Sequence, residues 1–358
     1  MKRWHSVVLT FTILTLAENA ELSKYVVFIC LPFLILTIRS GVSRRLVRVL
    51  LPLIGVLLIS LFQGSSSLYE NIKDIILLAR PIIYYLVFYG LMKLRWLDYR
   101  SVDFYIFIKV LIAIAIWIVD GMSLDLQYVR YSSGAAYWPA VYLLVNFKNS
   151  FMKKLAGFWI VLISSSRVVI GSFISLIVLR NSLLKMLLIL IPSVVLLAPL
   201  VSGNSRLLNT FDELSFNSHM SQSDMSKQWR GYEHYLMFSE FTEWDMATKV
   251  FGRGLGSNVR TGLNSVELPL GILSRFHNSL LTVLLKSGLV GILFILSHFI
   301  ILFKLLDKSE NVLLFSYILL VFSSLFTMGY YTVNISVFPI LFIVNIFLEN
   351  HEGRSEHS

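Results

Sequence analysis

Apolar runs long enough to cross a lipid bilayer recur along most of this 358-residue chain. Hydrophobic residues make up 56% of the sequence, charged residues make up only 15%, and the mean hydropathy is +0.74. Soluble domains carry about 25% charged residues, so this composition excludes an ordinary soluble fold. We therefore expect an all-α protein whose helices cross a membrane repeatedly.

The apolar runs predict about twelve transmembrane spans, several of them short, because a helix needs about 20 apolar residues to cross a bilayer. The expected spans lie near residues 6–19, 24–38, 49–63, 75–92, 103–119, 135–147, 154–166, 168–180, 183–201, 278–303, 312–329 and 331–348.

Basic residues gather in every second connection between these runs, as the positive-inside rule requires of cytoplasmic loops. They are Lys2 and Arg3; Arg39, Arg44, Arg45 and Arg48; Lys93, Arg95 and Arg100; Lys148, Lys153 and Lys154; Arg180 and Lys185; and Lys304 and Lys308. This pattern predicts that both termini are cytoplasmic. The basic cytoplasmic loops also explain the net charge of +10, so we expect no nucleic-acid partner.

The predicted organisation has four parts: N-terminal spans over residues 1–201, a large polar loop on the outer side over 202–276, C-terminal spans over 277–348, and a cytoplasmic tail over 349–358. Within the loop, residues 228–241 place aromatic and aliphatic side chains at helical spacing. They predict an amphipathic helix that lies on the membrane or over a cavity. The glycine-rich residues 252–256 predict a flexible turn.

His277 stands where the outer loop meets the apolar run 278–303. Histidine titrates near neutral pH, so at this water boundary it is a candidate proton acceptor for a reaction on a lipid-linked substrate. The alternative is a role in capping the following helix. Gly288 and Gly291, inside the run, indicate close helix packing.

Four local patterns, in this order, resemble the bacterial family of O-antigen polymerases and O-antigen ligases, which are membrane glycosyltransferases. The resemblance is closest over residues 155–300. The patterns are Arg130 with Ser133-Gly134-Ala135-Ala136-Tyr137; Ser164-Ser165-Ser166-Arg167; Trp229-Arg230 through Tyr235 with the glycines at 252–256; and His277-Asn278 followed by Gly288-Leu289-Val290-Gly291.

The resemblance implies a GT-C-like helical fold in the bacterial inner membrane. The donor would be an oligosaccharide linked to undecaprenyl diphosphate, and the reaction would take place at the periplasmic face without a metal or other cofactor. A polymerase, which we expect here, transfers the glycan to another lipid-linked repeat unit, and a partner protein can set the chain length. A ligase transfers it to lipid A–core instead. The spacing from His277 to Gly291 favours the ligase, so the acceptor stays open.

The same resemblance makes His277, Arg167 and Arg230 the expected catalytic residues. Arginine suits a lipid diphosphate, because one guanidinium group can donate two parallel hydrogen bonds to phosphate oxygens. The expected diphosphate-binding residues are Arg80, Arg130 and Arg275.

Each arginine also has a structural interpretation. Arg80 could pair with Asp74 or Glu70, Arg167 could reach the membrane interface from a short span, and Arg275 could serve as an interfacial anchor. Arg230 could belong to a solvated helix face. A flippase or transporter for lipid-linked sugars is the alternative of a different class, but the sequence lacks the internal symmetry typical of transporters.

Overall fold

The computed structural model describes residues 2–18, 41–62, 67–119, 151–164, 229–261, 272–306, 310–326 and 337–345, with further positions within 32–39, 142–143, 171–179 and 347–348. This part of the chain is almost entirely helical, as the sequence predicts, and its one β-structure is a short antiparallel pair of strands.

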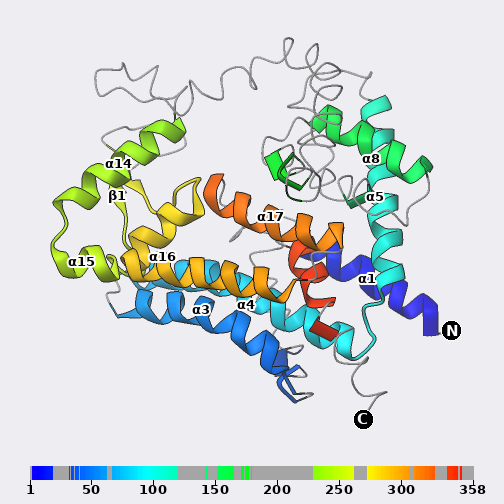
Figure 1. Ribbon diagram of the computed structural model, residues 1–358, viewed down its shortest axis with the longest axis horizontal. Coiled ribbons are helices and arrows are strands. Elements are labelled where there is room, and N and C mark those ends of the chain that lie inside the picture. Colours follow the sequence, from blue (N-terminus) through cyan, green and yellow to red (C-terminus); the bar gives the residue numbers. More distant parts are fainter. Residues whose placement is uncertain are drawn as a thin grey trace.

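Three helices form a bundle: α3 (Arg44–Leu61), α4 (Leu68–Lys93) and α16 (Ser279–Leu305). Helix α3 packs against both of the others (Figure 1). Ser43 caps α3 by accepting a hydrogen bond from the backbone N–H of Leu46, and Ser67 caps α4 in the same way. The bundle corresponds to the expected spans 49–63, 75–92 and 278–303.

Two of the described helices, α4 and α16, are long and apolar enough to cross a membrane. Both α3 and α16 also carry a line of exposed large apolar side chains at helical spacing. On α3 these are Val47, Leu51, Ile54, Leu58 and Leu61, and on α16 they are Leu289, Leu293, Leu296 and Ile300. Uncovered apolar stripes of this kind favour contact with lipid. The prediction of membrane helices is supported for α4 and α16, whereas the full count of twelve spans stays a prediction.

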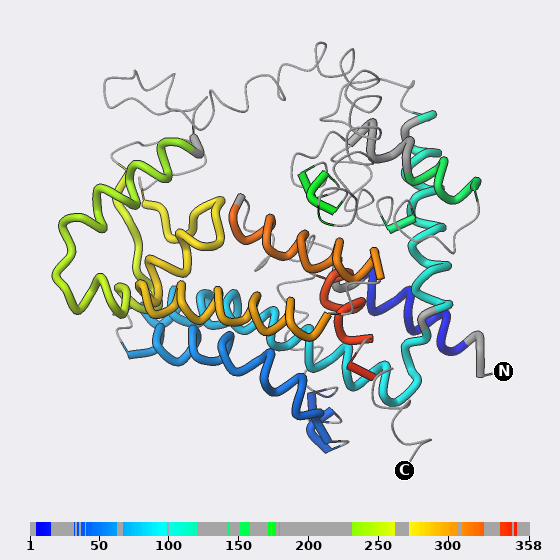
Figure 2. Tube along the Cα trace, viewed as in Figure 1, coloured from blue at the N-terminus to red at the C-terminus, as the bar shows by residue number. Residues whose placement is uncertain are grey.

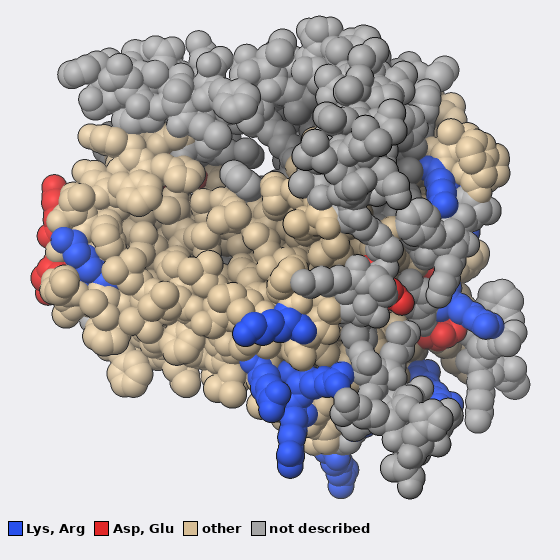
Figure 3. Space-filling view, viewed as in Figure 1, with Lys and Arg blue, Asp and Glu red and all other residues tan. Residues whose placement is uncertain are grey.

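The basic residues predicted to be cytoplasmic gather at one end of the bundle, which we call the basic end. Helix α3 begins there with Arg44, Arg45 and Arg48, α4 ends there with Lys93, and α16 ends there with Lys304. A hydrogen bond of 2.9 Å between His298 Nδ1 and the Val49 carbonyl holds α16 against α3 near this end. On the face drawn in Figure 3, an uncharged belt separates these side chains from the few charges at the opposite end.

The opposite end, which we call the loop end, carries α14 (Trp229–Glu243), α15 (Met246–Phe251), β1 (Val259–Arg260) and β2 (Ile272–Leu273). A second apolar core joins them to the start of α16. It contains Met237, Trp244, Val259, Leu273, Phe276, Leu281, Leu284 and Leu285. The amphipathic helix predicted over residues 228–241 is therefore present as α14, and its buried side packs on this second core.

Helix α16 is interrupted at Gly288, where φ is 62° and ψ is −159°. Figure 2 shows the tube turning back sharply at this point. The first part of α16 is buried, whereas the second part carries the exposed stripe. The expectation of one regular span over 278–303 is thus wrong in its first third, because a positive φ that glycine alone adopts readily reverses the helix.

The turn over residues 252–256 fits into this interruption. A Cβ atom added to Gly252 would lie 2.5 Å from the Ser287 nitrogen, and one added to Gly288 would lie 2.4 Å from the Val250 oxygen. Two backbone segments approach so closely here that neither position has room for a side chain. The turn is pinned by hydrogen bonds to the bundle, so the prediction that it is flexible is wrong.

The remaining helices agree with other predicted spans. They are α1 (Lys2–Glu18), α5 (Tyr99–Val119), α8 (Phe151–Ser164) and α17 (Asn311–Phe326), with further helical turns over 337–345. Helix α5 runs steeply across the direction of the bundle in Figure 1, so it does not repeat the geometry of α3, α4 and α16. The expected spans near 24–38, 135–147, 168–180 and 183–201 lie largely outside the described residues.

Candidate functional site

His277 is held by two hydrogen bonds to one carboxylate. Its backbone N–H donates to Glu233 Oε2 over 2.9 Å, and its Nδ1 lies 2.8 Å from Glu233 Oε1. The Glu233 side chain is 1% exposed, whereas that of His277 is 58% exposed. A buried carboxylate on α14 thus orients an imidazole that remains open to solvent.

This arrangement decides which ring nitrogen can accept a proton. An ionised carboxylate only accepts hydrogen bonds, so Nδ1 must carry the hydrogen in the bond to Glu233. In the neutral imidazole Nε2 then has a free lone pair. The pair has the geometry of a general base with an orienting carboxylate behind it.

The helix start next to His277 is fixed by local hydrogen bonds. Asn278 caps α16, because its Oδ1 accepts from the Leu280 N–H over 2.9 Å. The Thr282 hydroxyl accepts from the Phe276 N–H over 3.1 Å. Phe276 itself is fully buried in the second apolar core. The residues on both sides of His277 are therefore anchored, and its ring, held by Glu233, is the accessible group.

Arg80 and Arg275 lie within electrostatic range of each other. Arg80 comes from the middle of α4, and Arg275 comes from the segment between β2 and α16. Burial lowers the pKa of Arg275, and the carboxylates of Asp74 and Glu70 act in the opposite direction. Two of the three arginines expected to bind a diphosphate are thus brought together beside a pair of carboxylates.

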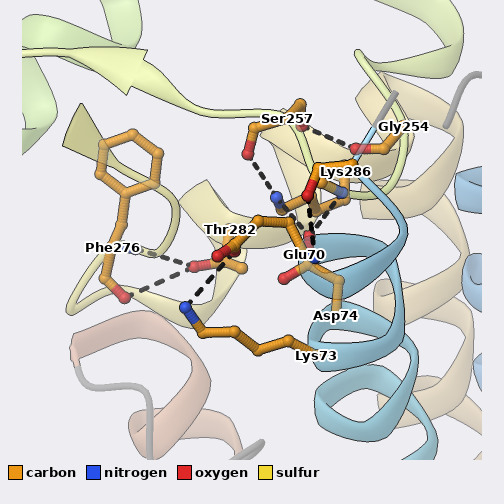
Figure 4. A network of polar contacts seen from close by, with 10 residues as sticks. Glu70, Lys73, Asp74, Gly254, Ser257, Phe276, Thr282 and Lys286 are labelled. Carbon is orange, nitrogen blue, oxygen red and sulfur yellow. Dashed lines mark hydrogen bonds and ion pairs between the residues drawn. The ribbon is translucent and has the colours of Figure 1, made fainter. Parts of the chain in front are cut away.

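Asp74 forms a buried ion pair with Lys286, whose Nζ lies 2.6 Å from Asp74 Oδ2 (Figure 4). Both side chains are almost completely inaccessible. Lys286 also donates to the Ser257 carbonyl over 2.5 Å, and the Gly256 N–H donates to Asp74 Oδ2 over 2.8 Å. The pair therefore joins α4, α16 and the turn at 252–257. Lys286 is thus the described partner of Asp74, and the pairing of Arg80 with Asp74 or Glu70 stays an interpretation.

Glu70 and Lys73 complete this network on the first turns of α4, with Lys73 Nζ 3.3 Å from Glu70 Oε2. Figure 4 places both residues beside Asp74 and Thr282. Three cationic side chains (Lys73, Arg275 and Lys286) thus lie near two carboxylates (Glu70 and Asp74), and Arg80 lies within electrostatic range of Arg275.

The other expected site residues are not brought to this site by the described structure. Arg230 lies in the first turn of α14, three residues before Glu233, and the position of its side chain lies outside the described residues. Arg130 and Arg167 also lie outside the described residues. Arg253 pairs with Glu240 at 2.6 Å and lies over the Trp244 ring, so it has a structural role within the loop.

Two residues of the site were not singled out from the sequence. Glu233 lies in an amphipathic helix where acidic residues are ordinary, so only its contact with His277 distinguishes it. Lys286 did carry a signal, because it is the one charged residue in residues 278–303. A lone charge in an apolar run calls for a buried partner, and Asp74, also in a largely apolar helix, was the available carboxylate.

Among the described residues, no group of three or more His, Cys, Asp or Glu side chains is placed to hold a metal ion. No protein-family model matches the chain, and no curated protein matches it significantly.

Proposed function

We propose that this chain is a membrane glycosyltransferase that polymerises a surface polysaccharide, transferring a glycan from undecaprenyl diphosphate to the sugar of another lipid-linked repeat unit. The observation that carries the proposal is the His277–Glu233 pair at the start of α16. It supplies an oriented, accessible base at the point where the sequence resembles the O-antigen polymerase and ligase family.

In the proposed reaction, a hydroxyl group of the acceptor sugar attacks the anomeric carbon of the donor glycan. A new glycosidic C–O bond forms, and the bond between the anomeric carbon and the diphosphate oxygen breaks. His277 Nε2 takes the hydroxyl proton, and undecaprenyl diphosphate leaves with the bonding electron pair. Glu233 stabilises the imidazolium that results.

The two arginines beside this network support a dianionic substrate, because a diphosphate that links a sugar to a lipid carries two negative charges. Arg80 and Arg275 suit its oxygens, because guanidinium groups make charge-assisted and often bidentate hydrogen bonds to phosphate. They would also stabilise the charge that develops on the diphosphate as the sugar departs.

The proposal includes a polytopic topology of about twelve spans in the bacterial inner membrane, with both termini in the cytoplasm. The gathering of basic residues at one end of α3, α4 and α16 supports the cytoplasmic assignment of that end. His277 and the loop elements α14 and α15 would then lie on the periplasmic side, where undecaprenyl-linked glycans are presented to such enzymes.

Transporter folds also contain interrupted helices, and there the break lines the substrate path. Here the carbonyls of Leu285 and Lys286 accept hydrogen bonds from Arg253 and Gly254, at 2.8 and 3.1 Å. Because the protein itself occupies the break, this geometry supports an enzyme at the membrane surface over a transporter.

The test is deletion of the coding sequence, with lipopolysaccharide separated by size. Core carrying a single repeat unit supports the polymerase. Bare core together with long lipid-linked glycan would mean a ligase, and unchanged banding would contradict both. Complementation with His277→Ala should fail, whereas His5→Ala, which removes an exposed histidine on α1, should restore wild-type banding. Membrane levels of both variants are measured in parallel.

A further inference from the structure

Helix α15 exposes large apolar side chains although it belongs to a polar loop. Met246 is 76% exposed and Phe251 is 45% exposed. We infer that α15 is inserted into the outer boundary of the bilayer, with Met246 and Phe251 in contact with lipid acyl chains. The inference depends on the orientation of the bundle in a membrane and not on the proposed glycosyl transfer.

The thickness of the bilayer is the first argument. Between the break at Gly288 and the basic residue Lys304, α16 has fifteen mostly apolar residues, Leu289 to Phe303, with Ser297 and His298 among them. These residues extend for about 22 Å at 1.5 Å per residue, whereas the hydrocarbon layer is about 30 Å thick. If Lys304 marks the inner boundary, about 8 Å of hydrocarbon extends beyond Gly288. The chain segment that occupies this level is the end of α15, because the Val250 carbonyl lies against Gly288.

The exposed surface of α15 is continuous with the lipid-facing stripe of α16. The residue after Val250 is the exposed Phe251, and the residue after Gly288 is the exposed Leu289. Leu293 continues the same stripe toward the basic end. The close approach of Val250 to Gly288 therefore brings the exposed Phe251 near the start of the exposed stripe of α16.

The backbone of the adjoining turn meets the requirement that a bilayer sets for irregular structure, namely that every N–H has a partner within the protein. Gly252 donates to Thr248 O, Arg253 to Leu285 O, Gly254 to Lys286 O and Leu255 to Ser60 O. Gly256 donates to Asp74 Oδ2. A water-exposed turn has no need of five consecutive internal partners.

The basic side chains near α15 turn toward α14, whereas Asp245 lies exposed at the start of α15, where its side chain accepts from the Thr248 N–H. Lys249 Nζ donates to the Thr242 carbonyl over 3.1 Å, and Arg253 pairs with Glu240. This separation of long basic side chains from exposed Met and Phe is the pattern of an interfacial element, in which charges reach for water while apolar groups enter the lipid.

The test uses spin labels, which is practical because Cys30 is the only cysteine. In a Cys30→Ser background, the full chain carries Phe251→Cys or, as the matched control, Ser239→Cys on an exposed polar position of α14. Both are labelled with the same nitroxide and reconstituted in vesicles of phosphatidylethanolamine and phosphatidylglycerol. Collision with oxygen, which concentrates in lipid, is compared with collision with a water-soluble nickel complex.

We expect the ratio of oxygen to nickel collision at position 251 to exceed that at position 239 severalfold. Equal ratios would place α15 in water and overturn the inference. A label at 251 that is shielded from both reagents would mean that protein covers α15, which also overturns it. Met246→Cys gives a second reading on the same helix if the label at 251 disturbs its packing.

Discussion

The role assigned to Glu233 predicts a specific kinetic defect for Glu233→Gln. The carboxamide retains an oxygen that can accept from the backbone N–H of His277, so the local fold should survive. The charge-assisted hydrogen bond to Nδ1 is lost, and such bonds contribute about 1.5–3 kcal/mol. Because each 1.36 kcal/mol corresponds to a tenfold change in rate, we expect glycan transfer to slow by about 10- to 100-fold.

The assay is transfer between purified lipid-linked repeat units by the reconstituted protein, followed at several substrate concentrations. The turnover rate should fall while the KM for the lipid-linked donor changes little, because Glu233 acts on the base and not on the diphosphate. The control is Glu240→Gln, which removes the other loop carboxylate described with a close basic partner, Arg253. It should retain the wild-type rate.

The same reasoning requires that Glu233 act through His277. His277→Ala should reduce transfer further than Glu233→Gln, and the double variant should be no slower than His277→Ala alone. Additive losses would show that Glu233 contributes to the reaction independently. Wild-type turnover in Glu233→Gln would refute the orienting role altogether.

Three further predictions concern the network and the break in α16. Lys286→Met should lower the free energy of unfolding in detergent by about 3–5 kcal/mol, because Asp74 is left buried without its cation. Adding Asp74→Asn to this variant should recover part of the lost free energy. If no free energy is recovered, the pairing of Asp74 with Lys286 is contradicted. Gly288→Ala should lower the thermal unfolding midpoint more than Gly291→Ala. Position 288 has a positive φ of 62° and its added Cβ meets only backbone, at 2.4 Å, whereas a Cβ at 291 meets side-chain atoms of Ser287 at 2.4 and 2.5 Å. Equal midpoints would contradict the close approach. Arg275→Ala should raise the KM for the lipid-linked donor. The control, Arg260→Ala at an exposed position of β1, should leave that KM unchanged. An equal rise in both variants would mean that general surface charge, and not a specific contact of Arg275, sets the KM.

The hydrophobic pattern alone was enough to predict the three helices of the bundle, though not that they pack together. The bounds of α3, α4 and α16 agree with the apolar runs to within several residues, because the length of a run and the charges at its ends set where a membrane helix can begin and stop. The amphipathic spacing over 228–241 likewise predicted α14. These are properties of neighbouring residues, which a single sequence contains in full.

The partners of the charged residues could not be read in this way. Glu233 and His277 are separated by 44 positions, and Asp74 and Lys286 are separated by more than 200. Their contacts exist because α14 packs on the start of α16 and because the turn at 252–256 enters the break at Gly288. The sequence showed that His277 stood at a boundary; only the tertiary structure decided that a buried carboxylate would hold its ring, since that depends on which distant segments pack together.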